Sequence, residues 1–143
     1  MARVGRASRN ASLLRVEGTI TGDKTIASAE SGELYFIDAS AASTDFTITL
    51  PTAKEGAYLS FVLVAASHSS SEVMLDAGSG SVIKGVAVDT TGAGAAELSE
   101  ISDQQVKFAD SAILGSRISI VCDGTDWLIT DAVAHPAFTT GAF

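Results

Sequence analysis

An Asp-Gly pair, Asp123-Gly124, stands between two apolar runs in residues 117–131, RISIVCDGTDWLITD. Such a pair is a strong signal for a β-hairpin, because a two-residue type I′ turn needs residues that tolerate positive φ. The resulting opposed pairs would be Cys122 with Thr125, Ile120 with Trp127, and Ile118 with Ile129. Because opposed residues share a face, this register predicts one apolar face that includes the chain's only Trp. We therefore expect a core hairpin with Asp123, Gly124 and Trp127 as structural anchors.

Other apolar or alternating runs recur along the chain and are separated by turns rich in Gly, Ser, Asp and Pro. A chain of 143 residues is long enough for one domain with a sizeable core. Residues 58–66, YLSFVLVAA, are almost continuously apolar, which predicts a central strand covered on both faces. Residues 97–105 suggest one helical turn. The other expected strands are residues 13–16, 19–26, 34–37, 45–50, 73–75, 82–88 and 106–108. This spacing predicts an all-β fold, an antiparallel β-sandwich, jelly-roll or barrel-like domain of about 8–10 short strands.

Charge divides the chain into unequal parts. The formal net charge is −8, from nine basic and seventeen acidic residues. Four of the basic residues and none of the acidic ones lie in residues 1–15, so this segment is +4 and the remainder is −12. We expect residues 1–15 to form a basic arm that docks on an acidic partner, residues 16–133 to form the β domain, and residues 134–143 to form a tail. The alternative for the first segment is a frayed terminus. The acidic body argues against nucleic acid as a partner.

Motifs that carry chemistry are missing from the sequence. The single Cys excludes an internal disulfide and a Cys-based zinc site. His68 and His135 lack ligand-spaced neighbours, and no Ser lies in a G-x-S-x-G elbow. Residues 123–126 could offer oxygens to calcium, but a hairpin turn explains them fully. We therefore expect no catalytic residue, no metal, no cofactor and no enzymatic activity. The apolar runs are too short to span a membrane, so we expect no membrane partner.

The order of elements resembles that of small β-structured virion proteins of tailed bacteriophages. In those proteins a Ser-Gly precedes the first body strand, an alternating strand ends in Leu-Pro, and a Gly turn leads into a long apolar strand. A final hairpin carries a D/N-G-x-x-W motif. The resemblance covers roughly residues 19–131, through TITGDKTIASAESGELYFID, DFTITLPTAKEGAYLSFVLV, SGSVIKG and GSRISIVCDGTDWLITD. The matching positions are all framework residues: Leu50-Pro51, Gly56, Asp123-Gly124 and Trp127.

This resemblance implies a capsid decoration (cement) protein that binds the outer surface of the major capsid protein shell and stabilises it. It also implies a homo-oligomer, a trimer, on the outside of the virion. The residues expected to dock on the capsid are Arg3, Arg6, Arg9, Arg15, Phe138 and Phe143, the two Phe because a lone monomer would expose them. The same motifs occur in receptor- or glycan-binding modules of tail fibres and spikes, which is the alternative. One compact domain without a shaft favours decoration. A small glycosidase or lyase would need an acid–base pair that the sequence does not offer.

Overall fold

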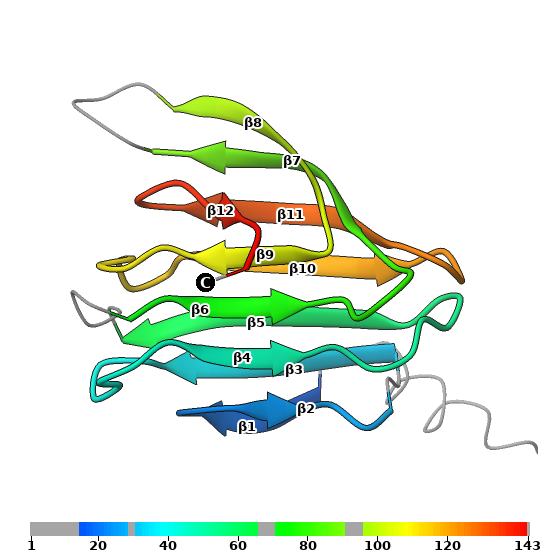
Figure 1. The fold of residues 1–143 in the computed structure, drawn as a ribbon, viewed down its shortest axis with the longest axis horizontal. Coiled ribbons are helices and arrows are strands. Elements are labelled where there is room, and N and C mark those ends of the chain that lie inside the picture. The colour runs from blue at the N-terminus through cyan, green and yellow to red at the C-terminus, as the bar shows by residue number, and fades with distance from the viewer. Residues whose placement is uncertain (1–14, 29–30, 66–70, 91–95, 143) are drawn as a thin grey trace, which may run out of the picture.

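The computed structural model describes residues 15–28, 31–65, 71–90 and 96–142, and within them every regular element is a β-strand (Figure 1). No helix in these ranges is long and apolar enough to cross a membrane. The strands are β1 (Arg15–Ile20), β2 (Lys24–Thr25), β3 (Ser31–Asp38), β4 (Phe46–Thr49), β5 (Tyr58–Ala65), β6 (Val73–Asp76), β7 (Ile83–Asp89), β8 (Glu97–Asp103), β9 (Gln105–Phe108), β10 (Arg117–Cys122), β11 (Trp127–Ala134) and β12 (Thr139–Thr140).

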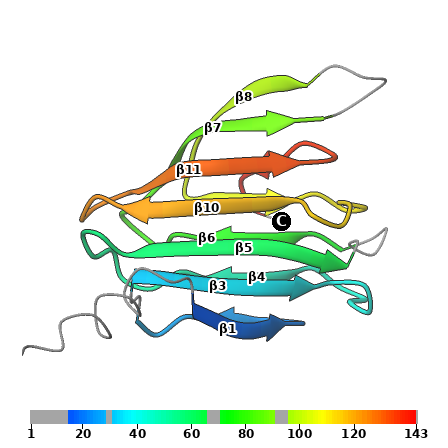
Figure 2. The same ribbon diagram turned by 180° about the vertical axis from the view of Figure 1, so that it is seen from behind.

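These strands form two sheets. The large sheet has seven strands in the order β1-β3-β5-β10-β11-β7-β8, and the small sheet has five in the order β12-β9-β6-β4-β2. Strands β1 and β8 lie at opposite edges of the large sheet, as Figures 1 and 2 show. The β10–β11 hairpin occupies the centre of that sheet, between β5 and β7.

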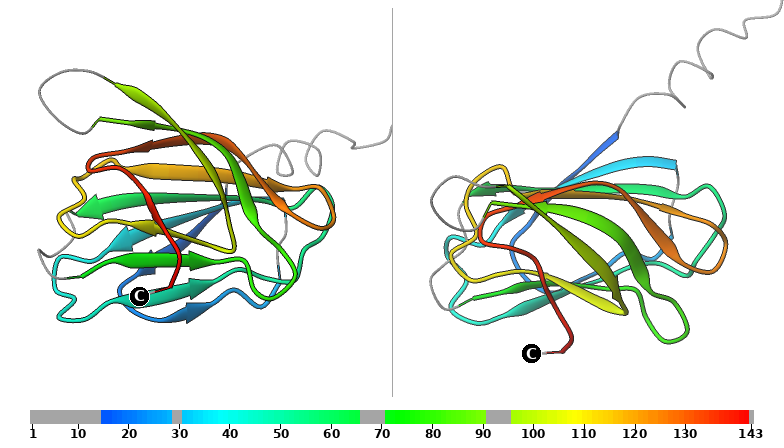
Figure 3. Two further views of the ribbon diagram at one scale, coloured as in Figure 1. Left: turned by 45° about the horizontal axis from the view of Figure 1, so that its top comes forward. Right: turned by 90° about the horizontal axis from the view of Figure 1, so that it is seen from above.

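The two sheets lie in two layers that enclose one hydrophobic core (Figure 3). In the small sheet, Phe46, Val73 and Phe108 are opposed across three strands and are all buried. In the large sheet, the inward residues are every second residue of each strand, which is the periodicity of a sheet with one covered face. They include Ile37, Leu59, Phe61, Leu63, Ile118, Ile120 and Trp127.

The prediction of an all-β fold is confirmed, whereas the expectation of antiparallel sheets is wrong. Five of the ten pairings among the described strands are parallel: β1 with β3, β3 with β5, β2 with β4, β4 with β6, and β11 with β7. Parallel neighbours need a crossover connection, and here the chain makes it by alternating between the two layers. Local alternation of apolar residues does not distinguish the two kinds of pairing, so the sequence pattern could not reveal this mixture.

The central hairpin forms, but with a loop of four residues instead of two. Cys122 is opposite Trp127, Val121 is opposite Leu128, and Ile120 is opposite Ile129. The predicted register is therefore wrong by two residues. A shift by two preserves the side-chain phase, so Trp127 still faces inward and is fully buried. Farther along, a bulge between Ser119 and Ile120 shifts the register once more.

Two other expectations also need correction. Strand β5 is central, but its outward face is only partly covered, because Ser60 on that face is buried whereas Val64 is 40% exposed. Residues 97–103 form strand β8 and not a helical turn. Its pairing with β7 over seven residues outweighs the weak local preference of Glu and Ser for other conformations.

Asp76, at the end of β6, gives a pH-dependent contribution to stability. Its carboxylate accepts hydrogen bonds from the Gly78 amide at 2.8 Å and from the Gln104 and Gln105 side-chain amides, each at 3.1 Å. Burial alone would raise the pKa of Asp76, but the hydrogen bonds from Gln105, Gly78 and Gln104 together hold it below its ordinary value. A lowered folded-state pKa contributes stability above the unfolded pKa, and that stability is lost as the pH falls through the folded pKa.

We therefore expect Asp76→Asn to lower the free energy of unfolding by about 1 kcal/mol at neutral pH, since the amide cannot accept all three bonds. The difference from wild type should shrink on acidification below about pH 4, where the wild-type carboxylate is also being protonated. Urea unfolding at several pH values measures this. Asp110→Asn, on an exposed loop, is the control. A difference that stays constant with pH would contradict the assignment.

Candidate functional site

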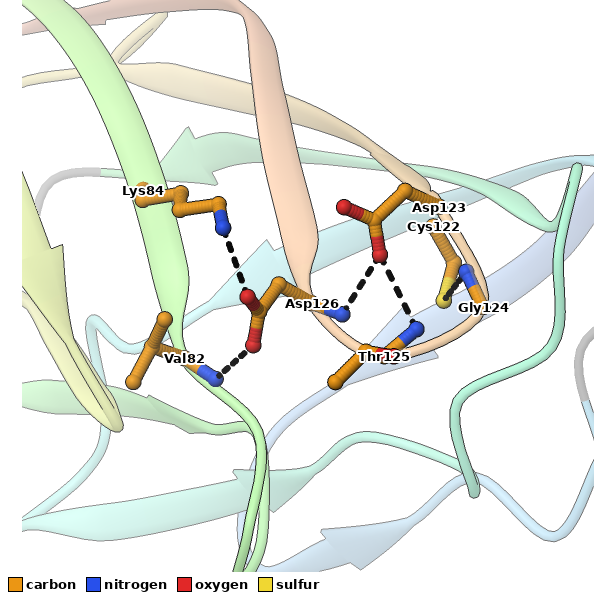
Figure 4. Close-up of polar contacts among 7 residues, drawn as sticks. All are labelled: Val82, Lys84, Cys122, Asp123, Gly124, Thr125 and Asp126. Carbon is orange, nitrogen blue, oxygen red and sulfur yellow. Dashed lines mark hydrogen bonds and ion pairs between the residues drawn. The ribbon is translucent and has the colours of Figure 1, made fainter.

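The loop of the central hairpin is held by its own carboxylates (Figure 4). Asp123 Oδ1 accepts hydrogen bonds from the amides of Thr125 at 2.9 Å and Asp126 at 2.8 Å. These backbone donors, first Asp126 and then Thr125, hold the pKa of Asp123 below its usual range. Gly124 has a φ of 103°, whereas Asp123 does not have a positive φ, so the turn is not the expected type I′. The Asp123 side chain closes a longer loop, and this is why the register differs.

The same loop is tied to the neighbouring strand. Asp126 accepts a hydrogen bond from the Val82 amide at 3.1 Å and forms an ion pair with Lys84 at 2.6 Å (Figure 4). Lys84 lowers the pKa of Asp126, and Asp126 in turn raises the pKa of Lys84. Both carboxylates of the loop therefore already have structural partners. Within the described part of the chain, no group of three or more His, Cys, Asp or Glu side chains could hold a metal ion.

Arg15 is the one predicted docking arginine that lies in the described structure. It begins β1 and forms ion pairs with Glu17 and with Glu33, the latter at 3.3 Å. Glu33 is buried and also accepts a hydrogen bond from the Tyr35 hydroxyl at 3.0 Å. Burial and the Glu33 carboxylate raise the pKa of Tyr35. Arg15 thus compensates a buried carboxylate at the sheet edge, a contact that the sequence pattern did not indicate.

The remaining predicted docking residues divide into two groups. Phe138 contacts the core and packs its ring against Phe108 at a centroid distance of 5.1 Å. Phe138 is therefore partly buried within its own chain, and its docking role stays a prediction. Arg3, Arg6, Arg9 and Phe143 lie outside the described residues, so their docking role stays a prediction.

Exposed apolar side chains gather at one end of the outer face of the large sheet. We call this surface the apolar end; its exposed members are Val64, Val86, Leu98, Ile113 and Leu114, and it also includes the half-buried Val88 and Val133. Leu98 is 77% exposed and Leu114 is 65% exposed. An exposed apolar cluster of this kind on a protein surface commonly marks an interaction site.

Strand pairing makes the apolar end continuous. Val133 of β11 is opposite Val88 of β7, and Val88 is opposite Leu98 of β8. Ile113 and Leu114, in the loop before β10, line a shallow hollow with Val133. On its other side this loop is bonded to β5, where the Gly115 amide donates to the Leu63 carbonyl at 2.9 Å. The apolar end therefore extends across four strands and one loop.

Polar groups occupy the middle of the same outer face. The hydroxyls of Ser60 and Ser119 lie 2.6 Å apart, and hydrogen bonds from Ser119 and Ser60 lower the pKa of Tyr58. Arg117 and Asp131 form an exposed ion pair at 2.7 Å. This polar band separates the apolar end from Val16, the exposed apolar residue on β1 at the far edge.

Sequence reasoning missed the apolar end for two reasons. The sequence pattern predicts a helical turn around Leu98, and Ile113 and Leu114 lie in a loop without periodicity. Their large apolar side chains between charged or small neighbours were the available signal. Only the pairing of distant strands brings them together.

Two surface pockets lie among the described residues. A pocket of about 450 Å³ lies beside the hairpin loop and is lined by uncharged residues, including Pro51, Ser79 and Thr125. A second, of about 300 Å³, lies along β1 and includes Glu17, Lys24 and Tyr35. Glu17 already forms an ion pair with Arg15, so its carboxylate has a structural partner.

The chain is therefore an all-β protein of two mixed sheets, and the large sheet has an exposed apolar end. Neither a protein-family model nor a curated protein matches the chain.

Proposed function

We propose that the chain is a bacteriophage capsid decoration protein that binds the outer surface of the major capsid protein shell and stabilises it. The observation that carries this proposal is the apolar end. It is part of the outer face of the large sheet, and no described segment packs over it. The resemblance of residues 19–131 to virion proteins of tailed phages supplies the partner.

Burial of the apolar end would favour binding. Covering a largely exposed Leu contributes about 1.5–3 kcal/mol, and Leu98 and Leu114 are the two most exposed large apolar residues described. A protein that binds only the assembled shell stabilises that shell by mass action. Attachment in closed three-fold groups is part of this proposal and rests on the resemblance.

We expect the double substitution Leu98→Thr with Leu114→Thr to weaken attachment to particles at least tenfold, since about 1.4 kcal/mol corresponds to a factor of ten. Val16→Thr is the matched control, because Val16 is also exposed but lies beyond the polar band. Co-sedimentation of purified protein with phage particles that lack it measures attachment. Equal loss in the control, or no loss in the double variant, would exclude the apolar end as the docking surface.

The function itself is tested by comparing particles with and without the protein after heat or osmotic shock. Decoration predicts lower survival of the particles that lack it and unchanged adsorption to host cells. Equal survival with lost adsorption would favour the tail-fibre or spike module. Equal survival with equal adsorption would exclude both.

A further inference from the structure

Strand β8 presents an open edge. It pairs with β7 on one side, and on the other side its backbone forms no hydrogen bond to a described residue. It is seven residues long and lies at the border of the large sheet, as Figures 1 and 2 show. An open edge of this length can accept another strand through its free amides and carbonyls.

This edge is strongly acidic. Glu97, Glu100 and Asp103 lie along β8, and none of them forms an ion pair within the described ranges. Opposite Glu97 lies Asp89, whose carboxylate is buried and whose Oδ1 has no hydrogen-bond partner among the described residues. If two copies of β8 paired antiparallel and centred on Glu100, Glu100 would lie opposite Glu100 and Glu97 opposite Asp103. Like charges directly opposite each other are destabilising. The edge therefore favours a basic strand.

The chain contains a basic segment with the same spacing. The acidic residues of β8 recur every three positions, at 97, 100 and 103, and the arginines recur every three positions, at 3, 6 and 9. In an antiparallel pairing with Arg6 opposite Glu100, Arg9 is opposite Glu97 and Arg3 is opposite Asp103. Opposed residues share a face, so each arginine would lie beside a carboxylate. A parallel pairing gives three matched pairs as well.

We propose that residues 1–14 of a second copy of this chain add to the open edge of β8 as an eighth strand of the large sheet. Distance favours a second copy over the same copy. Arg15 is fixed in β1, six strand spacings from β8, which is about 29 Å at about 4.8 Å per spacing. From Arg9 to Arg15 the chain spans at most about 22 Å when fully extended. Arg9 of one copy therefore cannot reach its own β8, and because both pairings place Arg9 opposite an acidic residue of β8, all three matched pairs can form only with a second copy.

The resulting contact is head-to-tail, because each copy contributes its first residues from the β1 edge and accepts those of a neighbour at the β8 edge. Such a contact closes into a ring when the rotation between copies allows it and otherwise forms a filament. This inference concerns the purified protein and does not depend on the proposed role in a virion.

Size-exclusion chromatography with light scattering on the full chain tests the proposal. Wild type should associate, with association weakened by salt because the matched charges are exposed. One variant reverses the charge of β8 with Glu97→Lys and Glu100→Lys. The other reverses the charge of the N-terminal segment with Arg3→Glu, Arg6→Glu and Arg9→Glu. Each variant alone should associate about tenfold more weakly than wild type, since several opposed pairs become repulsive. Mixing these two variants should restore association, because the acidic segment then meets the basic β8 and the basic segment meets the acidic β8.

Glu55→Lys with Asp110→Lys is the matched control for the β8 variant, since it makes the same change in net charge at exposed sites outside β8. It should associate as wild type does. A wild type that has the mass of one chain at all concentrations would overturn the proposal. So would a mixture of the two reversed variants that stays dissociated, which is the result expected if each segment bound its own chain.

Discussion

Replacing Trp127 with Ala is expected to lower the free energy of unfolding by about 3–5 kcal/mol, as for other large buried aromatic side chains. Trp127 is fully buried, and it lies between Cys122 of β10 and Ile83 of β7 in the middle of the large sheet. Its removal leaves a cavity that neighbours on both sides cannot easily fill. Urea denaturation followed by circular dichroism measures the change. A loss below about 1 kcal/mol would show that Trp127 does not anchor the core.

The matched control is Trp127→Phe. The buried Nε1 of Trp127 has no hydrogen-bond partner among the described residues, so loss of this donor removes no hydrogen bond. Phe retains an apolar ring, and we expect a loss below about 2 kcal/mol. If Phe were as destabilising as Ala, the indole nitrogen would have a partner that the structure lacks.

Gly85→Ala is the second substitution with a large expected effect, about 2–4 kcal/mol of destabilisation. Gly85 has a φ of 147°, which L-residues rarely adopt, and an added Cβ would lie 2.8 Å from Cβ of Ile129. It lies where the β7–β11 register is interrupted, between the pairs formed by Leu128 and Val133. The close approach of the two strands there requires a residue without a side chain.

Gly124→Ala separates backbone strain from the steric clash. Gly124 also has a positive φ, of 103°, but the nearest atom to an added Cβ is Cβ of Glu55 at 3.6 Å. We expect this variant to lose about 1–2 kcal/mol, less than Gly85→Ala. Equal losses in thermal unfolding would mean that contact with Ile129 contributes nothing.

Local patterns predicted much of the fold because they depend on neighbouring residues. The apolar pattern of residues 45–50 predicted a strand, and β4 forms there with Phe46 and Ile48 both buried. The Asp-Gly pair predicted the hairpin, and the error in its register came from a side-chain contact, the Asp123 carboxylate closing a four-residue loop. Such a contact has no signature in periodicity.

The candidate site was less predictable because it depends on which distant strands become neighbours. The apolar end requires β11 beside β7 and β7 beside β8, pairings that the sequence pattern does not specify. The buried pair of Glu33 and Arg15 likewise depends on β1 lying beside β3. The spacing of the arginines was visible in the sequence, but its counterpart on β8 became meaningful only once residues 97–103 were a strand at an edge.

The central position of the β10–β11 hairpin also determines the order in which the chain can fold during synthesis. The early strands β3 and β5 can pair, and so can β7 and β8, but only residues 117–134 join these two parts of the large sheet. Until the ribosome has released those residues, one edge of β5 and one edge of β7 have no partner. A nascent chain therefore carries two unfinished half-sheets for most of its translation, and completion must wait for nearly the last strand. Stalled or truncated products that end before residue 117 should be the species that aggregate and engage chaperones.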